Sequence, residues 1–278
     1  MFCSGAKKID IKNIYAQEMI SVVVPTKNSA HTIGACLASI DAQTNVEVEL
    51  LVIDNHSTDD TRDIAKKYTR HIYSHGPERS AQRNFGMHKS SGDIVVFIDS
   101  DMTLESAVLS QIASLMRVNP DIKSVFIPEK TTAKGFWGAC KVFERNFYMI
   151  GEPTVEAARA YAKGAFVELG GFDESISAGE DWDLSDRFAK HYPHGRITAC
   201  IVHHEGTVKL VEQLRKKRYY GKTGANTYLQ SYAPLARKIP YPFKRSVFRQ
   251  WYLFIHHPIL GCGSVVLKLL EITCLIAP

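Results

Sequence analysis

Two aspartates separated by one serine, Asp99-Ser100-Asp101, follow a strongly apolar run at 93–98. We expect that run to form a buried strand. Ionised carboxylates at its end cost desolvation free energy unless a cation or hydrogen-bond donors pair with them. A divalent metal held by one or two carboxylates and by substrate phosphates would meet this need. The alternative is that the two aspartates cap a helix that begins near Leu104.

A second acidic cluster lies at 179–183, where Glu180, Asp181 and Asp183 fall within four residues. Carboxylates at the start of a predicted helix are stabilised by its dipole. That role would account for Glu180 and Asp183. The dipole explains neither the aromatic Trp182 within the cluster nor the Gly-Gly turn at 170–171 before it. We therefore treat the segment as a second candidate site.

Two arginines, Arg79 and Arg83, lie four residues apart on a predicted helix and so share one of its faces. Guanidinium groups there suit a diphosphate, and a face of surface salt bridges is the alternative. Asp54 ends another predicted strand. An acidic residue at such a place often accepts hydrogen bonds from a ribose or a base, and a turn or capping role is the alternative.

Two adjacent histidines, His203 and His204, end a predicted strand about twenty residues after the second acidic cluster. One of them could complete a metal site with Asp101. A purely structural histidine is the alternative.

The elements that would position these residues alternate between strand and helix along the first half of the chain. Strands are expected at 20–25, 47–53, 71–74, 93–98 and 122–127, and helices at 33–40, 78–90 and 104–118. The second half is less regular, with helices expected at 136–150 and 180–190 and strands at 164–171 and 197–203. This order predicts an α/β fold with a mostly parallel sheet. Such sheets bind ligands beyond the carboxyl ends of their strands, which here are 25–28, 54–57 and 99–101.

Composition and missing motifs exclude several classes of protein. The chain has 278 residues, of which 45% are hydrophobic and 23% charged, as in a globular protein. A mean hydropathy of −0.14 argues against a polytopic membrane protein. The six cysteines form no CxxC pair and no apolar leader opens the chain, so we expect reduced thiols and a cytoplasmic location. Glycine-rich dinucleotide loops, phosphate-binding loops and nucleophile elbows are absent from the sequence.

Taken in order, the motifs are far more specific than any one of them alone. The set comprises Val22-Val-Val-Pro-Thr-Lys-Asn28, Leu51-Val-Ile-Asp54 with Asn55-His-Ser-Thr-Asp59, Arg83-Asn-Phe-Gly86, Gly92 to Asp101, Gly170-Gly-Phe-Asp173 and Gly179-Glu-Asp181. It resembles the family 2 glycosyltransferases over residues 19–225. The resemblance implies the Rossmann-like GT-A fold, and an inverting transferase that uses a nucleotide-diphosphate sugar, with a UDP-sugar favoured, and Mg²⁺ or Mn²⁺.

The resemblance also implies a role for individual residues. The donor would be bound by Pro25, Thr26, Asn28, Asp54, Arg79, Arg83, Asp99, Ser100 and Arg218. Asp101 would bind the metal directly, with Asp99 and His203 in the metal shell and His203 ranked above His204. Asp181 would be the catalytic base, with Glu180 beside it. Arg215 and Arg218-Tyr219 resemble the QxxRW element of processive synthases, with Arg in place of Gln and Tyr in place of Trp.

The C-terminal part differs in charge from the rest of the chain. We expect a catalytic domain at 1–207 and an extension at 208–278. Between 208 and 250 there are eleven Lys/Arg and one acidic residue, Glu212, within a chain whose net charge is +5. Aromatic residues are interleaved there, and an amphipathic helix is expected at 264–277, shorter than the ~20 apolar residues that a spanning helix needs.

Basic residues, interfacial aromatics and an amphipathic helix together favour a peripheral protein on the cytoplasmic face of a membrane. The acceptor would then be a glycan or a polyprenyl-linked lipid. Packing of the helix on the catalytic domain, or contact with a second copy in an oligomer, is the alternative.

Three other functions remain in view. One is a catalytically inactive nucleotide-sugar-binding or membrane-associated assembly protein, against which the intact Asp101 and Asp181 argue. Another is a nucleotidyltransferase, which would need a glycine-rich basic loop that residues 24–28 do not supply. A nucleic-acid-binding protein is the third, but no recognition module matches, so no nucleic-acid partner is expected.

Overall fold

A computed structural model describes residues 19–149, 156–176, 179–222 and 251–276. Its centre is a seven-stranded sheet in the order β3-β2-β1-β4-β8-β6-β9. The strands are β1 (Met19–Thr26), β2 (Glu47–Asp54), β3 (Ile72–Ser74), β4 (Ile94–Phe97), β6 (Ser124–Phe126), β8 (Ala160–Ala162) and β9 (His194–Arg196). All neighbours pair in parallel except β8, which is antiparallel to both β4 and β6. The expected α/β fold with a mostly parallel sheet is confirmed.

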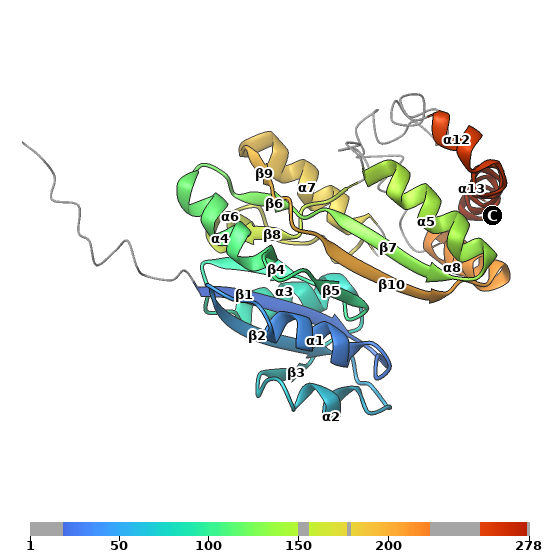
Figure 1. The fold of residues 1–278 in the computed structure, drawn as a ribbon. Helices are drawn as coiled ribbons and strands as arrows, with labels where there is room; N and C mark the ends of the chain where they lie inside the picture. The colour runs from blue at the N-terminus through green and yellow to red at the C-terminus, as the bar shows by residue number, and fades with distance from the viewer. Residues whose placement is uncertain (1–18, 150–155, 177–178, 223–250, 277–278) are drawn as a thin grey trace, which may run out of the picture.

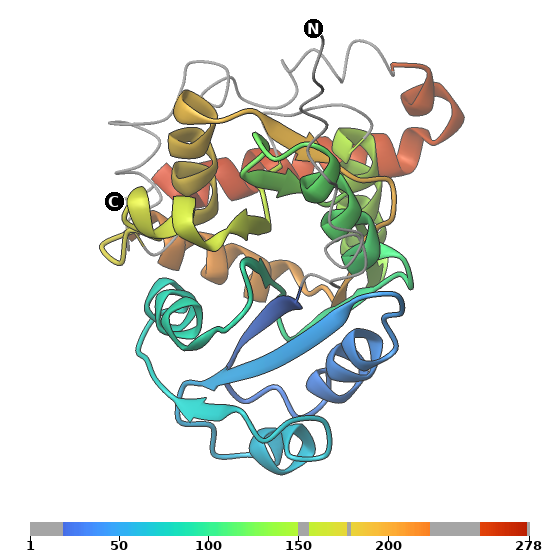
Figure 2. The ribbon, with the colours of Figure 1, turned by 90° about the vertical axis from the view of Figure 1, so that its left-hand side faces the viewer.

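Helices cover both faces of this sheet. They are α1 (Ile33–Asp41), α2 (Thr61–Ala65), α3 (Arg79–Lys89), α4 (Val108–Val118), α6 (Lys163–Glu168) and α7 (Glu180–His191). Figure 2 shows α1 and α3 on opposite sides of the blue strands. Strand β1 is buried on both faces, because Val22 joins the core cluster with α1 while Val23 joins the one with α3. Each such buried side chain contributes about 1.5–3 kcal/mol to the hydrophobic stabilisation.

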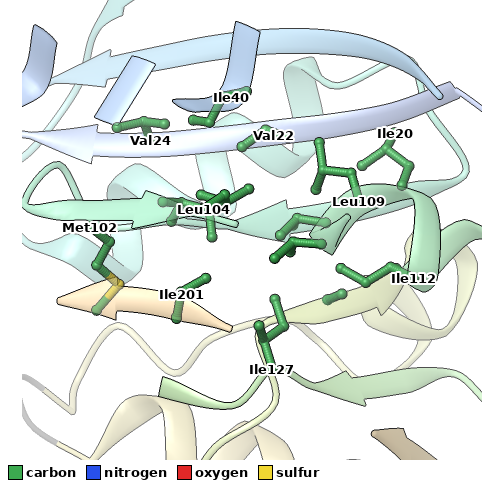
Figure 3. Packing of buried hydrophobic residues seen from close by; sticks show 14 of the residues in the cluster. Ile20, Val22, Val24, Ile40, Met102, Leu104, Leu109, Ile112, Ile127 and Ile201 are labelled. Atoms are coloured by element: carbon green, nitrogen blue, oxygen red, sulfur yellow. The ribbon is translucent and has the colours of Figure 1, made fainter. Parts of the chain in front are cut away.

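A smaller sheet carries the second half of the site. It consists of β5 (Met102–Leu104), β10 (Ile201–Thr207) and β7 (Glu129–Lys134), with β10 in the middle. Figure 3 shows the core cluster passing from Val22 and Val24 of β1, through Met102 and Leu104, to Ile201 of β10. One apolar core therefore holds both sheets together.

Four helices stand beside β7 and β10 at one end of the molecule (Figure 1): α5 (Phe136–Met149), α8 (Leu210–Lys222), α12 (Tyr252–His256) and α13 (Pro258–Ile276). The C-terminal helix α13 packs against α8 and against α5, and α5 packs on β7. No helix in the described ranges is both long and apolar enough to cross a membrane. The division of the chain at residue 207 stays a prediction; α13 nevertheless contacts α5, which lies before that boundary.

Two expected elements were wrong. Residues 163–168 form helix α6 instead of part of a strand at 164–171, and only Ala165 and Phe166 of that helix are buried. So short an apolar run carries no period that separates strand from helix. The expected helix at 104–118 begins only at Val108, because 102–104 form β5. Asp99 and Asp101 therefore do not cap it.

The expected strand at 197–203 begins four residues later, at Ile201. The reason is that side chains take the place of a neighbouring strand before it. Gln111 Oε1 accepts the backbone N–H groups of Thr198 and Ala199, each at 3.0 Å, and Glu105 Oε2 accepts that of Cys200 at 2.9 Å.

Candidate active site

A series of ion pairs links the residues after β4 to the start of α7. Arg83 donates from Nη2 to Asp99 Oδ1 at 2.7 Å and from Nη1 to Glu180 Oε1 at 3.0 Å. Arg79 approaches the same Glu180 oxygen at 3.6 Å. Helix α3 lies close enough to the sheet for this because its Gly86 has no side chain; a Cβ there would meet Val23 Cγ1 at 2.4 Å. Both arginines therefore converge on the second acidic cluster.

Asp99 is shared between two guanidinium groups. Its Oδ2 accepts from Arg159 at 3.4 Å, and Arg159 also donates to Glu129 Oε2 at 3.0 Å. Burial opposes ionisation of Asp99, but the charges of Arg83 and Arg159 outweigh it and hold the pKa of this carboxyl far below its usual range. Both carboxylate oxygens of Asp99 thus accept from arginine. Its roles in binding the donor and the metal stay predictions.

Asp101 has a different partner. Its Oδ2 lies 3.2 Å from His203 Nε2, and His203 Nδ1 lies 3.1 Å from Glu129 Oε1. Burial would lower the pKa of His203, but the hydrogen bonds with Asp101 and Glu129 raise it to about 9. His204 points to the other side of β10, where its ring contacts Thr103 and Thr132.

Asp101 and His203 would fit a divalent metal that displaces the proton shared between the two side chains. One carboxylate and one imidazole face each other, and Glu129 holds the second ring nitrogen, as carboxylates do behind metal-bound histidines. Within the described ranges no set of three or more His, Cys, Asp and Glu side chains is arranged to hold a metal ion. A two-ligand site suits Mg²⁺ or Mn²⁺, which would complete their shells with substrate phosphates and water.

The predicted nucleotide-binding residues lie at the ends of β1 and β2. Asp54 is fully buried, and it accepts from Ser57 Oγ at 2.5 Å and from Arg62 Nη1 at 3.3 Å. Asn28 has a positive φ of 49° and accepts the N–H of Thr58 at 2.8 Å. Both side chains thus shape the two loops that would border a nucleoside, so the turn-forming alternative for Asp54 is also realised.

The remaining predicted donor residues have varied surroundings. Pro25 and Thr26 are buried, and the Thr26 hydroxyl is a buried polar atom without a hydrogen-bond partner in the described structure. The Ser100 hydroxyl donates to Ser29 Oγ at 2.9 Å. Arg218 on α8 is exposed.

A pocket of about 280 Å³ opens between α7, the small sheet and the helices α5 and α8. Its acidic side holds Asp99, Glu180 and Asp181, and His203 also faces it. Gly179, with φ of 89°, gives the sharp turn that begins α7. Within the part of the chain that the structure describes, the Asp181 carboxylate accepts one hydrogen bond, from the backbone N–H of Trp182 at 2.9 Å.

The opposite side of the pocket is cationic. Lys141 and Arg145 of α5 line it together with Lys216 and Lys217 of α8. Lys141 pairs with Glu205 at 2.6 Å, and Lys217 lies 3.9 Å from Glu271 of α13. The pocket thus places the Asp181 carboxylate across from an array of positively charged side chains.

Comparison with known proteins identifies the family. The family model "Glycosyl transferase family 2" matches residues 21–166, more than half of the chain. The chain is a family 2 glycosyltransferase. The matched range contains the Asp99–Asp101 motif, whereas Asp181 and His203 lie beyond it.

Relatives and solved structures agree with this glycosyltransferase assignment. A PGL/p-HBAD biosynthesis glycosyltransferase of Mycobacterium tuberculosis is 27% identical over 181 residues, covering 62% of this chain and 70% of its own length. S. aureus TarS 1–349 in complex with UDP-GlcNAc has a TM-score of 0.53 at 18% identity, covering 92% and 81%. The mannosyltransferase PcManGT from Pyrobaculum calidifontis, in complex with GDP-Man and Mn²⁺, has a TM-score of 0.56 at 18% identity, covering 90% and 74%.

These structures have the GT-A fold, and this glycosyltransferase shares it. The TarS and PcManGT structures hold UDP-GlcNAc and GDP-Man, respectively. It spans 44% of a longer TarS chain that has also been solved.

Several site residues were missed in the sequence. Arg159 and Glu129 connect the Asp99 and His203 environments, yet neither belongs to a motif that suggested chemistry. Glu129 follows the short strand β6, so the rule that ligands lie beyond strand ends could have found it. Lys216 and Lys217 lie in the basic segment whose neighbours Arg215 and Arg218 were chosen instead.

Proposed function

We propose that this glycosyltransferase transfers a sugar, with inversion, from a nucleotide-diphosphate sugar to a hydroxyl or phosphate oxygen of a lipid-linked or membrane-proximal glycan acceptor. A UDP-sugar is the favoured donor, as in the TarS complex. The observation that carries the proposal is a pocket lined by Asp181 and His203, with His203 Nε2 lying 3.2 Å from Asp101 Oδ2. This arrangement offers a candidate base and a candidate metal site to one bound donor.

The reaction would be a single displacement. An acceptor oxygen attacks the anomeric carbon while the bond from that carbon to the diphosphate breaks. The bonding electron pair leaves with the diphosphate, and when the acceptor is a hydroxyl its proton passes to Asp181. In an inverting displacement the acceptor would attack from the side of the sugar ring on which Asp181 lies, and the diphosphate would leave from the opposite face.

Positioning would come from the surrounding charges. Arg83 ties the start of α7 to the end of β4 through Glu180 and Asp99. We propose that Glu180, which is buried and paired with two arginines, serves catalysis by holding Asp181 in place. Asp101 and His203 would hold Mg²⁺ or Mn²⁺. When bound, such an ion neutralises negative charge on the departing diphosphate.

The test of the base is Asp181→Asn. We expect kcat to fall about 10²–10⁴-fold, the usual contribution of general base catalysis, with the melting temperature and the affinity for the nucleoside diphosphate unchanged. Asp183→Asn is the matched control, because Asp183 pairs with Arg187 at 2.7 Å on the same helix and does not line the pocket. Transfer at the normal rate in Asp181→Asn would overturn the assignment.

A membrane surface is the proposed partner of the C-terminal helices. Apolar side chains are exposed on both helices, Ile255 on α12 and Ile259, Val266 and Leu269 on α13. The three on α13 are seven and three residues apart, so they lie toward one side of that helix. The predicted basic segment precedes them, although 223–250 and their aromatic residues lie outside the described residues. Apolar contact together with attraction to anionic lipid supports peripheral binding to the cytoplasmic leaflet.

Vesicle sedimentation tests this partner. With phosphatidylglycerol-containing vesicles, we expect the double variant Ile259→Ser/Leu269→Ser to bind several-fold more weakly than the wild type. Val118→Ser, at an exposed apolar position of α4, is the control and should bind normally. Equal binding by the double variant would remove α13 as the membrane-contacting element.

A further inference from the structure

Two cations in the pocket lack hydrogen-bonded partners. Within the described ranges Arg145 forms no hydrogen bond or ion pair, and Lys217 has only the 3.9 Å contact with Glu271. Both side chains are partly buried and line the pocket. Charged groups removed from bulk water are costly unless they are paired and hydrogen-bonded. The site is therefore built for a negatively charged ligand.

We propose that Lys141, Arg145, Lys216 and Lys217 form a cationic subsite for an anionic group of the acceptor, a phosphate or a carboxylate. This inference rests on the proposed function, since it names the acceptor class of the same pocket. Guanidinium and ammonium donors that approach from two helices would surround such a group from different directions.

The acidic residues nearby do not cancel the subsite. Glu205 is paired with Lys141 at 2.6 Å, and Glu129 is paired with Arg159 at 3.0 Å and with His203 at 3.1 Å. Burial opposes the charged form of Arg145, but the charges of these carboxylates and of Glu144 and Glu271 attract it and raise its pKa, although none of them is hydrogen-bonded to it in the described structure. The donors of Arg145 and Lys217 therefore stay open for hydrogen bonds to an incoming anion.

The position of the subsite favours the acceptor over the donor as the source of the anion. The residues predicted to hold the nucleoside, among them Asn28 and Asp54, lie at the ends of β1 and β2 and do not line this pocket. The predicted donor residues that do line it are on its acidic side, across from the cations: Arg79, Arg83 and Asp99. The cations come from α5 and α8, and they share the pocket with Asp181. An acceptor anchored there by its anion would present a neighbouring hydroxyl to the base.

Helix α13 holds the subsite in shape. Glu271 Oε1 accepts from Gln213 Nε2 of α8 at 2.5 Å, and Lys268 pairs with Glu144 of α5 at 2.6 Å. Burial, together with the charges of Lys268 and Arg145, lowers the pKa of Lys217 to about 8, against the opposing charge of Glu271. A bound anion would stabilise the ammonium form of Lys217.

The test measures binding of inorganic phosphate by calorimetry, with the diphosphate site saturated by UDP or GDP and Mn²⁺. We expect wild-type protein to bind phosphate in the presence of the nucleotide. Arg145→Gln and Lys217→Gln should each weaken that binding about tenfold or more, because each removes a charge-assisted contact. Arg117→Gln, at an exposed position on α4, is the matched control. Arg145→Lys keeps the charge and should recover part of the affinity.

Two results would overturn the proposal. Competition between phosphate and the nucleoside diphosphate would assign the cations to the donor. Absent binding, or binding unchanged in both variants, would remove the subsite altogether. A second readout separates this inference from the function on which it rests. Hydrolysis of the nucleotide sugar by the wild-type protein, with no acceptor present, tests the donor site alone; its absence would overturn the proposed function, whereas the phosphate-binding result decides the subsite.

Discussion

The pocket has a motif side, around Asp99 and Glu180, and a helical side, formed by α5 and α8. The two sides balance their charges in different ways. On the motif side, Arg83 and Arg159 share Asp99 between them and each holds a further carboxylate, so opposite charges meet at 2.7–3.4 Å. On the helical side, Arg145 and Lys217 have no hydrogen-bonded partner in the described structure. The first arrangement fixes side chains before any substrate arrives. The second leaves positive charge for a substrate to neutralise, so the same kinds of residue serve rigidity in one place and recognition in the other.

The largest expected effect lies on the motif side. Asp101→Asn should reduce transfer about 10³-fold, since Lewis-acid stabilisation of a leaving group contributes several kcal/mol. Mn²⁺ binding, followed by the electron paramagnetic resonance of the free ion, should weaken in parallel. Phosphate binding at the cationic subsite should stay unchanged, which would sharpen the contrast between the two sides. Asp121→Asn, at an exposed loop position, is the control. Normal Mn²⁺ affinity in Asp101→Asn would contradict the metal role.

A loss of stability should follow from Arg83→Met. This substitution leaves Asp99 and Glu180 with fewer positive partners inside the protein. Breaking a buried ion pair from one side costs about 3–5 kcal/mol in the free energy of unfolding. Chemical denaturation measures it, with Lys66→Met as the control, because the Lys66–Asp63 pair is exposed and contributes about 0–1 kcal/mol. Equal stability of the two variants would show that the ion pairs of Arg83 with Asp99 and Glu180 do not stabilise this part of the fold.

Glu271→Gln tests the helical side with two readouts of opposite sign. Unfolding free energy should fall by about 1–3 kcal/mol, because a buried partner of Gln213 and Lys217 is weakened. Sulfate affinity at the subsite should rise at pH 6, where Lys217 keeps its proton, because the variant has one negative charge fewer. Glu212→Gln, which alters only an exposed pair with Lys209, is the control. A fall in sulfate affinity would mean that Glu271 acts mainly by shaping the subsite.

The smallest effect concerns pH. Lys217 has a pKa of about 8, lowered by burial and by Lys268, Arg145 and Lys141 and opposed by Glu271. Sulfate affinity should therefore fall about fivefold to tenfold as the pH rises through 8, because the ammonium loses its proton. In unfolded chains the pKa of lysine is ~10.4. Between pH 8 and that value only the folded protein releases the proton, so the contribution of Lys217 to the free energy of unfolding rises with pH. Sulfate keeps its charge over this range, and Lys217→Arg should abolish the slope. A slope unchanged in that variant would assign it to another group.

The motif side could be predicted from the sequence because its signals are local. Asp101 and Asp181 follow or begin elements that the residue pattern itself marks. The ion-pair network could not, because Arg159 meets Asp99 from 60 residues away and only after β8 inserts antiparallel beside β4. Local pattern carries no information on such pairings.

Helical phase separates the neighbouring basic residues of α8, because consecutive residues of an α-helix point about 100° apart. Arg218, whose donor role stays a prediction, is exposed, whereas Lys217, one position earlier, lines the pocket. Sequence alone shows that this segment is basic, but the packing of α8 against α13 decides which face meets the pocket.

Strand β10 determines which of two adjacent histidines faces the site. His203 faces Asp101 and His204 faces Thr103 and Thr132, because successive side chains of a strand alternate between its sides. Insertion of a single residue before 201 that shifted the strand would leave a His-His pair in the sequence and yet exchange the two rings. Insertion of two residues would restore the parity of the strand. When distant relatives are aligned, the number of residues in the 197–200 loop, odd or even relative to this chain, therefore decides which histidine of a pair corresponds to His203.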